Sequence, residues 1–363
     1  MNILLVGGTF NYDGGRLSGY FAKLSKAIAE SFPDTHAIVS NGGNLETLAR
    51  YADDVKYCDL VIWGADVPNG APKLVNNLKK TNPNMMLVIT KNNISGNYTR
   101  KLLAARALDA KANLLIEFKR DDYGNVLGSI IDPLGNCFIE NEVHPNTVSL
   151  ILTSRLKLLA SMTRVGSIQV GDIDADMTAT TEVEKFLALT RRYAKTFHEL
   201  IHADDNGRML GNISFRCESG FPTYRDEDFI LVSKRNIDKR DIGMSAMVPV
   251  KLNEVSNDAS TKSVEYLGHA KPSVDTPIQR GLYKAWPNAN FMLHAHVYIE
   301  GAPFTENMIP CGALQEIDEI LKVLPDYSGD YVACINLIGH GSIAIAKNAS
   351  MLENIPYIAR ALM

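Results

Sequence analysis

The stretch "FMLHAHVY", from Phe291 to Tyr298, is an apolar, strand-like run that carries two histidines. His294 and His296 stand two positions apart, so in a strand both side chains leave the same face. That geometry lets two imidazoles reach one ion at about 2.0 to 2.1 Å from each nitrogen. A half-exposed strand whose imidazoles bond to their neighbours is the alternative. The pattern by itself leaves both readings open.

Two chemical groups flank this strand in the sequence. Asp275, in "KPSVDTP", precedes a helical segment that leads into the His-x-His strand, and its simplest role is that of a helix N-cap. His340, in "INLIGHGSIAIAK", lies between two β-type runs and between two glycines that allow a close approach of a ligand. If the three imidazoles and the carboxylate converge, they form the ligand set of a catalytic zinc or a similar ion.

The order and spacing of these motifs carry a resemblance. Gly-Asn-x-Ser at Gly211 is followed by Lys-Pro-Ser-x-Asp-Thr-Pro, by His-x-His nineteen residues after the acid, by Ile-Pro-Cys at Ile309 and by His-Gly at His340. This pattern resembles the class II aldolase family, which includes L-ribulose-5-phosphate 4-epimerase and the head domain of adducin. The resemblance covers residues 183–363, and it implies an α/β/α domain.

The resemblance implies a metal site. The metal-binding histidines of the family fall on His294, His296 and His340, and the ion would be Zn²⁺, or Mn²⁺ or Co²⁺ at the same site. The acid position is a glutamate in the aldolases and an aspartate in the epimerase, and this chain has Asp275. Since an aspartate is one methylene shorter, Asp275 is expected to act as a fixed fourth ligand more than as a mobile base. The choice favours an epimerase-like site.

The resemblance also implies a binding site for the phosphate of a sugar phosphate. Its expected residues are Gly211, Asn212, Ser214, Ser233, Lys234, Arg235 and Ser273. Val274 stands where relatives have a second serine, so one hydroxyl donor is lost. Lys234 and Arg235 replace a Ser-Gly or Thr-Gly turn, and this basic pair either captures a phosphate or carboxylate or forms an exposed turn.

The remote acid/base aspartate of the epimerase is absent here. Pro303 occupies that position, so Glu306 or Glu300 would have to act in its place. The expected reaction is aldol-type cleavage, or 4-epimerisation, of a ketose phosphate through an enediolate stabilised by the metal. Dehydration of a methylthioribulose-type phosphate uses the same fold and stays open. A non-catalytic, adducin-like binding module is the alternative. Members of the family are typically tetramers, which implies a homo-oligomer.

The first half of the chain alternates apolar runs with helical segments. The runs are rich in Val, Ile and Leu, as in strands buried on both faces of a parallel sheet: Asn2–Gly8, Thr35–Asn41, Cys58–Gly64, Met85–Thr90 and Asn113–Phe118. The pattern predicts a doubly wound, Rossmann-like or flavodoxin-like α/β domain over residues 1–165. Residues 166–180 are predicted as a linker, and residues 181–363 as the second domain. Turn signals within Gly124–Glu140 predict a hairpin or edge extension.

Ligands of doubly wound sheets bind beyond the carboxyl ends of the strands. These ends are rich in Gly, Asn and Asp at residues 7–15, 40–44, 64–70 and 90–93. They could bind a nucleotide or another small molecule, or they could be tight turns of a docking or regulatory domain. A third possibility for the whole protein is a nucleotide-linked or nucleotide-sugar-linked activity led by this first domain.

Composition excludes some partners. The 363 residues have a net charge of −4, which gives no long-range attraction to nucleic acid or to an anionic membrane. The sequence shows no apolar stretch long enough to span a bilayer and no basic leader before the first apolar run. The five scattered cysteines predict reduced thiols in a cytoplasm.

Overall fold

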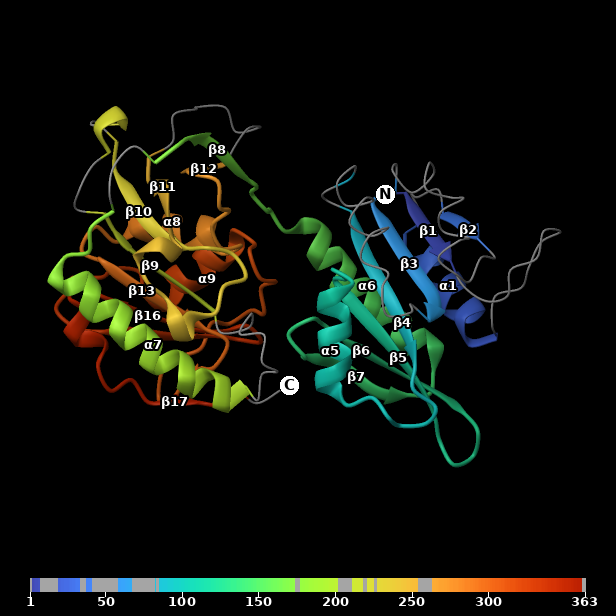
Figure 1. The fold of residues 1–363 in the computed structure, drawn as a ribbon. Helices are drawn as coiled ribbons and strands as arrows, with labels where there is room; N and C mark the ends of the chain where they lie inside the picture. Colours follow the sequence, from blue (N-terminus) through green and yellow to red (C-terminus); the bar gives the residue numbers. More distant parts are fainter. Residues whose placement is uncertain are drawn as a thin grey trace. The chain divides into compact units, whose positions relative to one another are not determined.

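The computed structural model describes residues 2–6, 19–32, 37–40, 58–66, 82, 85–173, 177–201, 211–217, 221–224, 227–253 and 263–360 (Figure 1). The chain divides into two compact units, the first made mainly of Met1–Ser161 and the second of Met162–Ala361. Within the described residues, no helix is long and apolar enough to cross a membrane.

The first unit contains a seven-stranded sheet in the order β2-β1-β3-β4-β5-β6-β7. Its strands are β1 (Ile3–Val6), β2 (Ala37–Ser40), β3 (Leu60–Asp66), β4 (Met86–Asn92), β5 (Leu114–Arg120), β6 (Val126–Ile131) and β7 (Cys137–Glu142). The five predicted strands are β1 to β5, and their neighbours pair in parallel. The expected hairpin extension is β6 and β7, which pair antiparallel.

The sheet of the first unit is therefore mixed, because the hairpin adds an antiparallel edge to the predicted parallel strands. Tight turns follow β5 and β6, and strands joined by a tight turn can pair only antiparallel. Each turn is closed by an aspartate whose side chain accepts a backbone N–H four residues later. Asp121 accepts the backbone N–H of Asn125 at 2.7 Å, and Asp132 accepts that of Asn136 at 2.9 Å.

Helices cover both faces of the first sheet. Helix α1 (Gly19–Ser31) and helix α6 (Pro145–Ser161) pack together over one face, where their apolar residues join those of β1, β3 and β5. Helix α5 (Arg100–Asp109) packs on the other face, against Trp63 and its neighbours. Two further predicted helices, over residues 45–55 and 71–80, lie outside the described residues, as do most of the glycine-rich strand ends.

The second unit contains an eight-stranded sheet in the order β15-β16-β13-β9-β10-β11-β12-β8. Its strands are β8 (Ser167–Gly171), β9 (Asn212–Arg216), β10 (Phe229–Ser233), β11 (Met247–Lys251), β12 (Val264–Leu267), β13 (Phe291–Ala295), β15 (Ala333–Leu337) and β16 (Gly341–Ala346). All neighbours pair antiparallel except β12 and β8. Because β8 lies within residues 166–180, part of the predicted linker belongs to this sheet.

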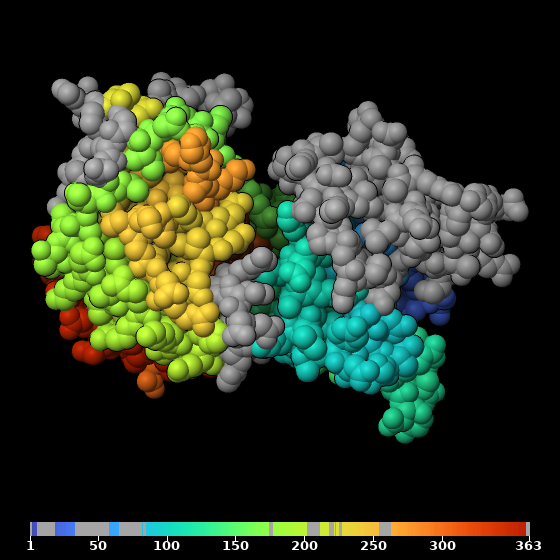
Figure 2. Space-filling model, in the orientation of Figure 1, coloured from blue at the N-terminus to red at the C-terminus, as the bar shows by residue number. Residues whose placement is uncertain are grey.

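Helices also cover both faces of the second sheet. Helix α7 (Thr181–Ile201) packs Phe186 and its other apolar residues on one face, and it forms much of the surface of this unit in Figure 2. Helices α8 (Thr276–Ala285) and α9 (Gln315–Val323) pack on the other face around Trp286. The result is an α/β/α arrangement in which β13, the His-x-His strand, lies between β9 and β16.

Candidate metal site

Three histidines converge at one end of the second sheet. His294 lies in β13, His296 directly follows that strand, and His340 lies in the turn between β15 and β16. The ring centroids of His294 and His340 are 4.6 Å apart, and that of His296 is 5.1 and 5.5 Å from them. One ring nitrogen of each lies within 4.8 Å of the other two, so the cluster could hold a metal ion.

The hydrogen bonds of these rings show that the residues fit an ion. A carbonyl oxygen can only accept, so His294 donates from Nδ1 to the oxygen of Ser342 at 2.9 Å. Its Nε2 is then an acceptor, and it is buried without a hydrogen-bond partner among the described residues. Nε2 of His340 and Nδ1 of His296 are likewise buried without a hydrogen-bond partner among the described residues. Such nitrogens are costly to bury unpaired, and a cation would satisfy them.

Burial keeps two of the three imidazoles neutral. It lowers the pKa of His294 to about 4, with a further contribution from His340, and it lowers the pKa of His296 well below the ordinary value. Neutral imidazole is the form that binds a metal. Burial acts on His340 too, but the neighbouring Glu316 and Cys311 outweigh it and raise the pKa well above the usual value. Metal binding at that ring would therefore release a proton.

Asp275 faces the histidines instead of capping its helix. It occupies the N-cap position of α8, yet its side chain makes no capping hydrogen bond. One carboxylate oxygen accepts from Asn212 Nδ2 at 2.8 Å, the other from Cys311 Sγ at 3.0 Å, and His294 Nε2 is 3.8 Å away. Burial raises the pKa of this carboxyl, but His340 and His294 outweigh it and lower the pKa. The expectation that the Asp275 side chain caps the helix is thus wrong.

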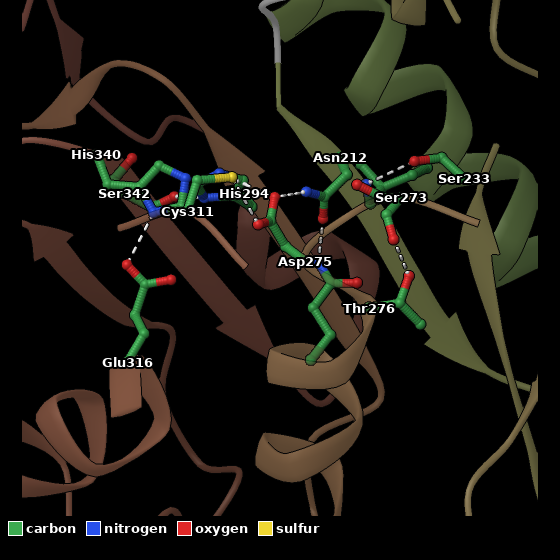
Figure 3. Close-up of polar contacts among 12 residues, drawn as sticks. Asn212, Ser233, Ser273, Asp275, Thr276, His294, Cys311, Glu316, His340 and Ser342 are labelled. Carbon is green, nitrogen blue, oxygen red and sulfur yellow. Dashed lines mark hydrogen bonds and ion pairs between the residues drawn. The ribbon is translucent and has the colours of Figure 1, made fainter. Parts of the chain in front are cut away.

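The structure adds residues to this site that the motifs did not single out. Glu316, in the first turn of α9, bonds Nδ1 of His340, and Cys311 bonds Asp275 (Figure 3). Lys239 is 4% exposed, and burial lowers its pKa to about 8 although Asp275 attracts its charge. Cys311 was visible only as part of the Ile-Pro-Cys motif, and no local pattern marks Glu316 or Lys239.

The sequence of this region matches a known family. Residues 191–359 match the profile of the Class II Aldolase and Adducin N-terminal domain. This part of the chain is a class II aldolase and adducin N-terminal domain. The resemblance predicted from the motifs is confirmed. No sequence among the curated proteins is significantly similar to the chain.

Solved structures are similar to part of the chain at low identity. YgbL from Klebsiella pneumoniae is 13% identical with a TM-score of 0.31, over 49% of this chain and 95% of its own. L-fuculose-1-phosphate aldolase from Thermus thermophilus is 16% identical with a TM-score of 0.29, over 47% and 86%. A DNA/pantothenate metabolism flavoprotein from Streptococcus pneumoniae is 14% identical with a TM-score of 0.32, over 44% and 99%. Scores this low support no transfer of function.

Three of the residues expected to bind phosphate are buried in the class II aldolase domain, where their side chains form hydrogen bonds with other residues. Asn212 is buried and bonds Asp275, and it also accepts from Gln279. Ser214 is fully buried, with its hydroxyl 3.1 Å from that of Tyr283. The hydroxyl of Ser233, also fully buried, accepts the backbone N–H of Ile213 at 3.2 Å.

Of the remaining expected residues, Gly211 is buried and the others are at least partly accessible. Ser273 and Lys234 are half-buried and Arg235 is exposed, and within the described residues neither Lys234 nor Arg235 forms a salt bridge. Glu306 is exposed and interacts with Lys322 of α9. Within the described part of the chain, no hydrogen bond or ion pair joins Glu306 to the three histidines. Its role as an acid/base stays a prediction.

Proposed function

We propose that the class II aldolase domain is a divalent-metal-dependent enzyme that cleaves, or epimerises at C4, a ketose phosphate. The observation that carries the proposal is the convergence of three imidazoles, each with one buried and unpaired nitrogen, beside the buried carboxylate of Asp275. A non-catalytic binding module has no need of unpaired buried nitrogens, which destabilise a fold. The adducin-like alternative is therefore the weaker one.

The imidazole-rich ligand set suits zinc, with manganese and cobalt as alternatives. A divalent cation held by His294, His296 and His340 supplies positive charge against the negative charge that develops on a substrate oxygen during C–C bond cleavage. The surrounding chain excludes water from that charge, because His294 and His340 are 4% and 1% exposed. In such a site an electrostatic interaction is stronger than in water.

The contacts of Asp275 favour a fixed role over a mobile one. Both of its oxygens are held, by Asn212 and by Cys311 (Figure 3). Gln279 in turn holds Asn212. A general base that swings between metal and substrate would have to break these bonds at each turnover. We therefore infer that Asp275 acts as a fixed ligand or a fixed charge, which supports the epimerase-like reaction over the aldolase.

Two accessible cations support the proposal of a phosphate site. Lys234 and Arg235 follow β10, and the backbone N–H of Arg235 donates to Lys271, two residues before Ser273. Three groups suited to a phosphate, two cations and a hydroxyl, thus lie on adjoining segments. We propose that Lys234, Arg235 and Ser273 form the phosphate site, and that Asn212, Ser214 and Ser233 shape the floor of the metal site.

The test is metal analysis of the purified protein, followed by incubation with pentulose and hexulose phosphates monitored by NMR. Cleavage, inversion at C4 and dehydration give different products. We expect a stoichiometric divalent metal, and we expect Lys234→Ala with Arg235→Ala to raise KM with little change in kcat. If the protein binds neither zinc nor manganese, and His294→Ala behaves as the parent protein, the catalytic proposal fails.

The first unit suggests a second ligand site. Its order β2-β1-β3-β4-β5 and its helices on both faces are those of a flavodoxin-like, doubly wound sheet. We propose that a small molecule, such as a nucleotide, binds at the carboxyl ends of these strands. Titration of the whole protein with nucleotides by calorimetry tests this. A homo-oligomer is also proposed, and sedimentation velocity tests it.

A further inference from the structure

The carboxylate of Glu316 is buried beside the metal site and is not explained by the proposed reaction. It is 3% exposed and lies 2.8 Å from Nδ1 of His340, which is 1% exposed. Burying a carboxylate costs free energy unless the group is paired, and the partner of Glu316 is His340.

The contact determines how His340 presents its ring. An ionised carboxylate can only accept, so Nδ1 of His340 is the donor and the opposite nitrogen, Nε2, points toward His294 and His296. Without Glu316, the proton could sit on either nitrogen and the ring could turn about its Cβ–Cγ bond. A carboxylate behind a ligating imidazole fixes both the tautomer and the orientation.

The position of Glu316 is itself set by helix packing. Glu316 lies in the first turn of α9, where a negative charge is favoured by the helix dipole. Its neighbour Ile317 packs against Gly281 of α8, where an added Cβ would come within 2.4 Å of the isoleucine methyl. Helix α8 carries Asp275 at its N-terminus. The close packing of the two helices thus holds both acids near His340, and Figure 3 shows the hydrogen bond between His340 and Glu316.

We propose that Glu316 is a positioning residue that fixes the tautomer and orientation of His340 and so preforms the three-histidine site. The inference rests on the proposed metal-binding function, since it names the residue that prepares one of the ligands. Glu316 touches neither the ion nor the substrate in this account. Its effect is on the affinity of the site for a divalent ion.

Glu319 provides a matched control. It lies one turn further along α9, is 5% exposed, and bonds Asn307 and Lys322 instead of a histidine. Zinc affinity of the full chain is measured by competition with a chromophoric chelator. We expect Glu316→Gln and Glu316→Ala to weaken zinc binding by about 10-fold and about 100-fold, the range for such outer contacts, and Glu319→Gln to leave it within about twofold. Circular dichroism of the metal-free proteins shows whether each variant folds.

A second measurement needs no metal. Long-range ¹H–¹⁵N correlation of the metal-free protein, with labelled histidine, reports the protonation of each ring nitrogen. At a pH above the pKa of His340, where the ring is neutral, we expect its proton on Nδ1 in the parent protein and a mixture of tautomers in Glu316→Ala. If the variants fold, keep this NMR pattern and bind zinc as the parent does, the proposal is overturned. If the parent protein binds no metal but the pattern changes, the proposed function fails while the role of Glu316 in orienting His340 stands.

Discussion

The ends of two central strands, β4 in the first unit and β13 in the second, both carry polar side chains with buried atoms. Within the described residues, only Asn93, after β4, has all of its side-chain polar atoms hydrogen-bonded. Asn93, directly after β4, donates to Glu117 and to the carbonyl of Tyr98, and it accepts the N–H of Tyr98 at 3.1 Å. His294 and His296, at the end of β13, each leave a buried ring nitrogen unpaired within the described residues.

Composition does not distinguish the two strand ends, since both are polar and both follow an apolar run. The difference is the completeness of the hydrogen bonding. A saturated cluster stabilises the fold and has nothing left to bind a ligand, whereas an unpaired buried nitrogen is tolerated where a ligand completes it. Asn93 lies in one of the strand ends that could bind a ligand, and we now expect its role to be structural.

The largest difference between the units is expected for a glycine substitution. Gly211 has φ +91°, and an added Cβ would lie 2.0 Å from the carbonyl oxygen of His294. Gly124, in the turn after β5, has φ +82° but nothing within 4 Å of such a Cβ. We expect Gly124→Ala to cost about 1 kcal/mol, from backbone strain alone, and Gly211→Ala to cost above about 3 kcal/mol because backbone atoms must move as well.

The two units can be followed separately, because the chain has two tryptophans, Trp63 in the first and Trp286 in the second. Fluorescence-detected urea unfolding of single-tryptophan variants gives the free energy of unfolding for each unit. Zinc binding should be lost in Gly211→Ala and retained in Gly124→Ala. Equal costs for the two substitutions would contradict the close approach at β13.

Lys239 extends the comparison of paired and unpaired buried groups to a buried charge. Its pKa is about 8 in the folded protein against 10.5 for the free side chain. Between these values the unfolded chain binds more protons, so stability rises with pH, and below pH 8 the buried cation costs up to about 3 kcal/mol. Lys239→Met should therefore stabilise the second unit at pH 7 by about 2 to 3 kcal/mol and should remove the rise between pH 8 and 10.5.

Lys251 is the matched residue for this experiment. It is also buried, but its ammonium pairs with Glu227 at 2.8 Å and with Glu265 at 3.4 Å. Lys251→Met leaves two carboxylates without their cation, so we expect it to destabilise the unit at pH 7. Urea unfolding of both variants at several pH values makes the comparison. A Lys239→Met protein that is no more stable than the parent at pH 7 would refute the account of Lys239.

The sequence predicts those parts of the molecule that depend on local pattern. Apolar runs predict β1 to β5, and the order of motifs predicts the meeting of His294, His296 and His340. Whether a sheet stays parallel depends on the connection between strands, and the aspartate turns after β5 and β6 decide that question here. These turn signals were present in the sequence, but they do not by themselves state which strand the hairpin joins.

Roles that arise from long-range packing are not predictable in this way. Glu316 meets His340 across 24 residues only because α9 packs beside the turn before β16. Ser214 matches a phosphate-binding motif by spacing, yet its hydroxyl faces Tyr283 in the interior. A motif gives the identity and spacing of residues, and the strand pairing decides which side chains face the site.

The smallest of the expected effects concerns Asn93, and it tests whether the cluster after β4 is structural. Asn93→Ala removes one partner of the buried Glu117, which keeps Lys119 at 3.2 Å, and two bonds to the backbone of Tyr98. The loss should be about 1 to 2 kcal/mol in the first unit, because buried polar atoms are left unpaired.

Asn125→Ala, in the exposed turn after β5, should change stability by at most about 0.5 kcal/mol. Zinc affinity should be unchanged in both. If Asn93→Ala instead left the first unit as stable as before and abolished a nucleotide titration, Asn93 would belong to a binding site, and saturated hydrogen bonding would no longer separate structural residues from functional ones.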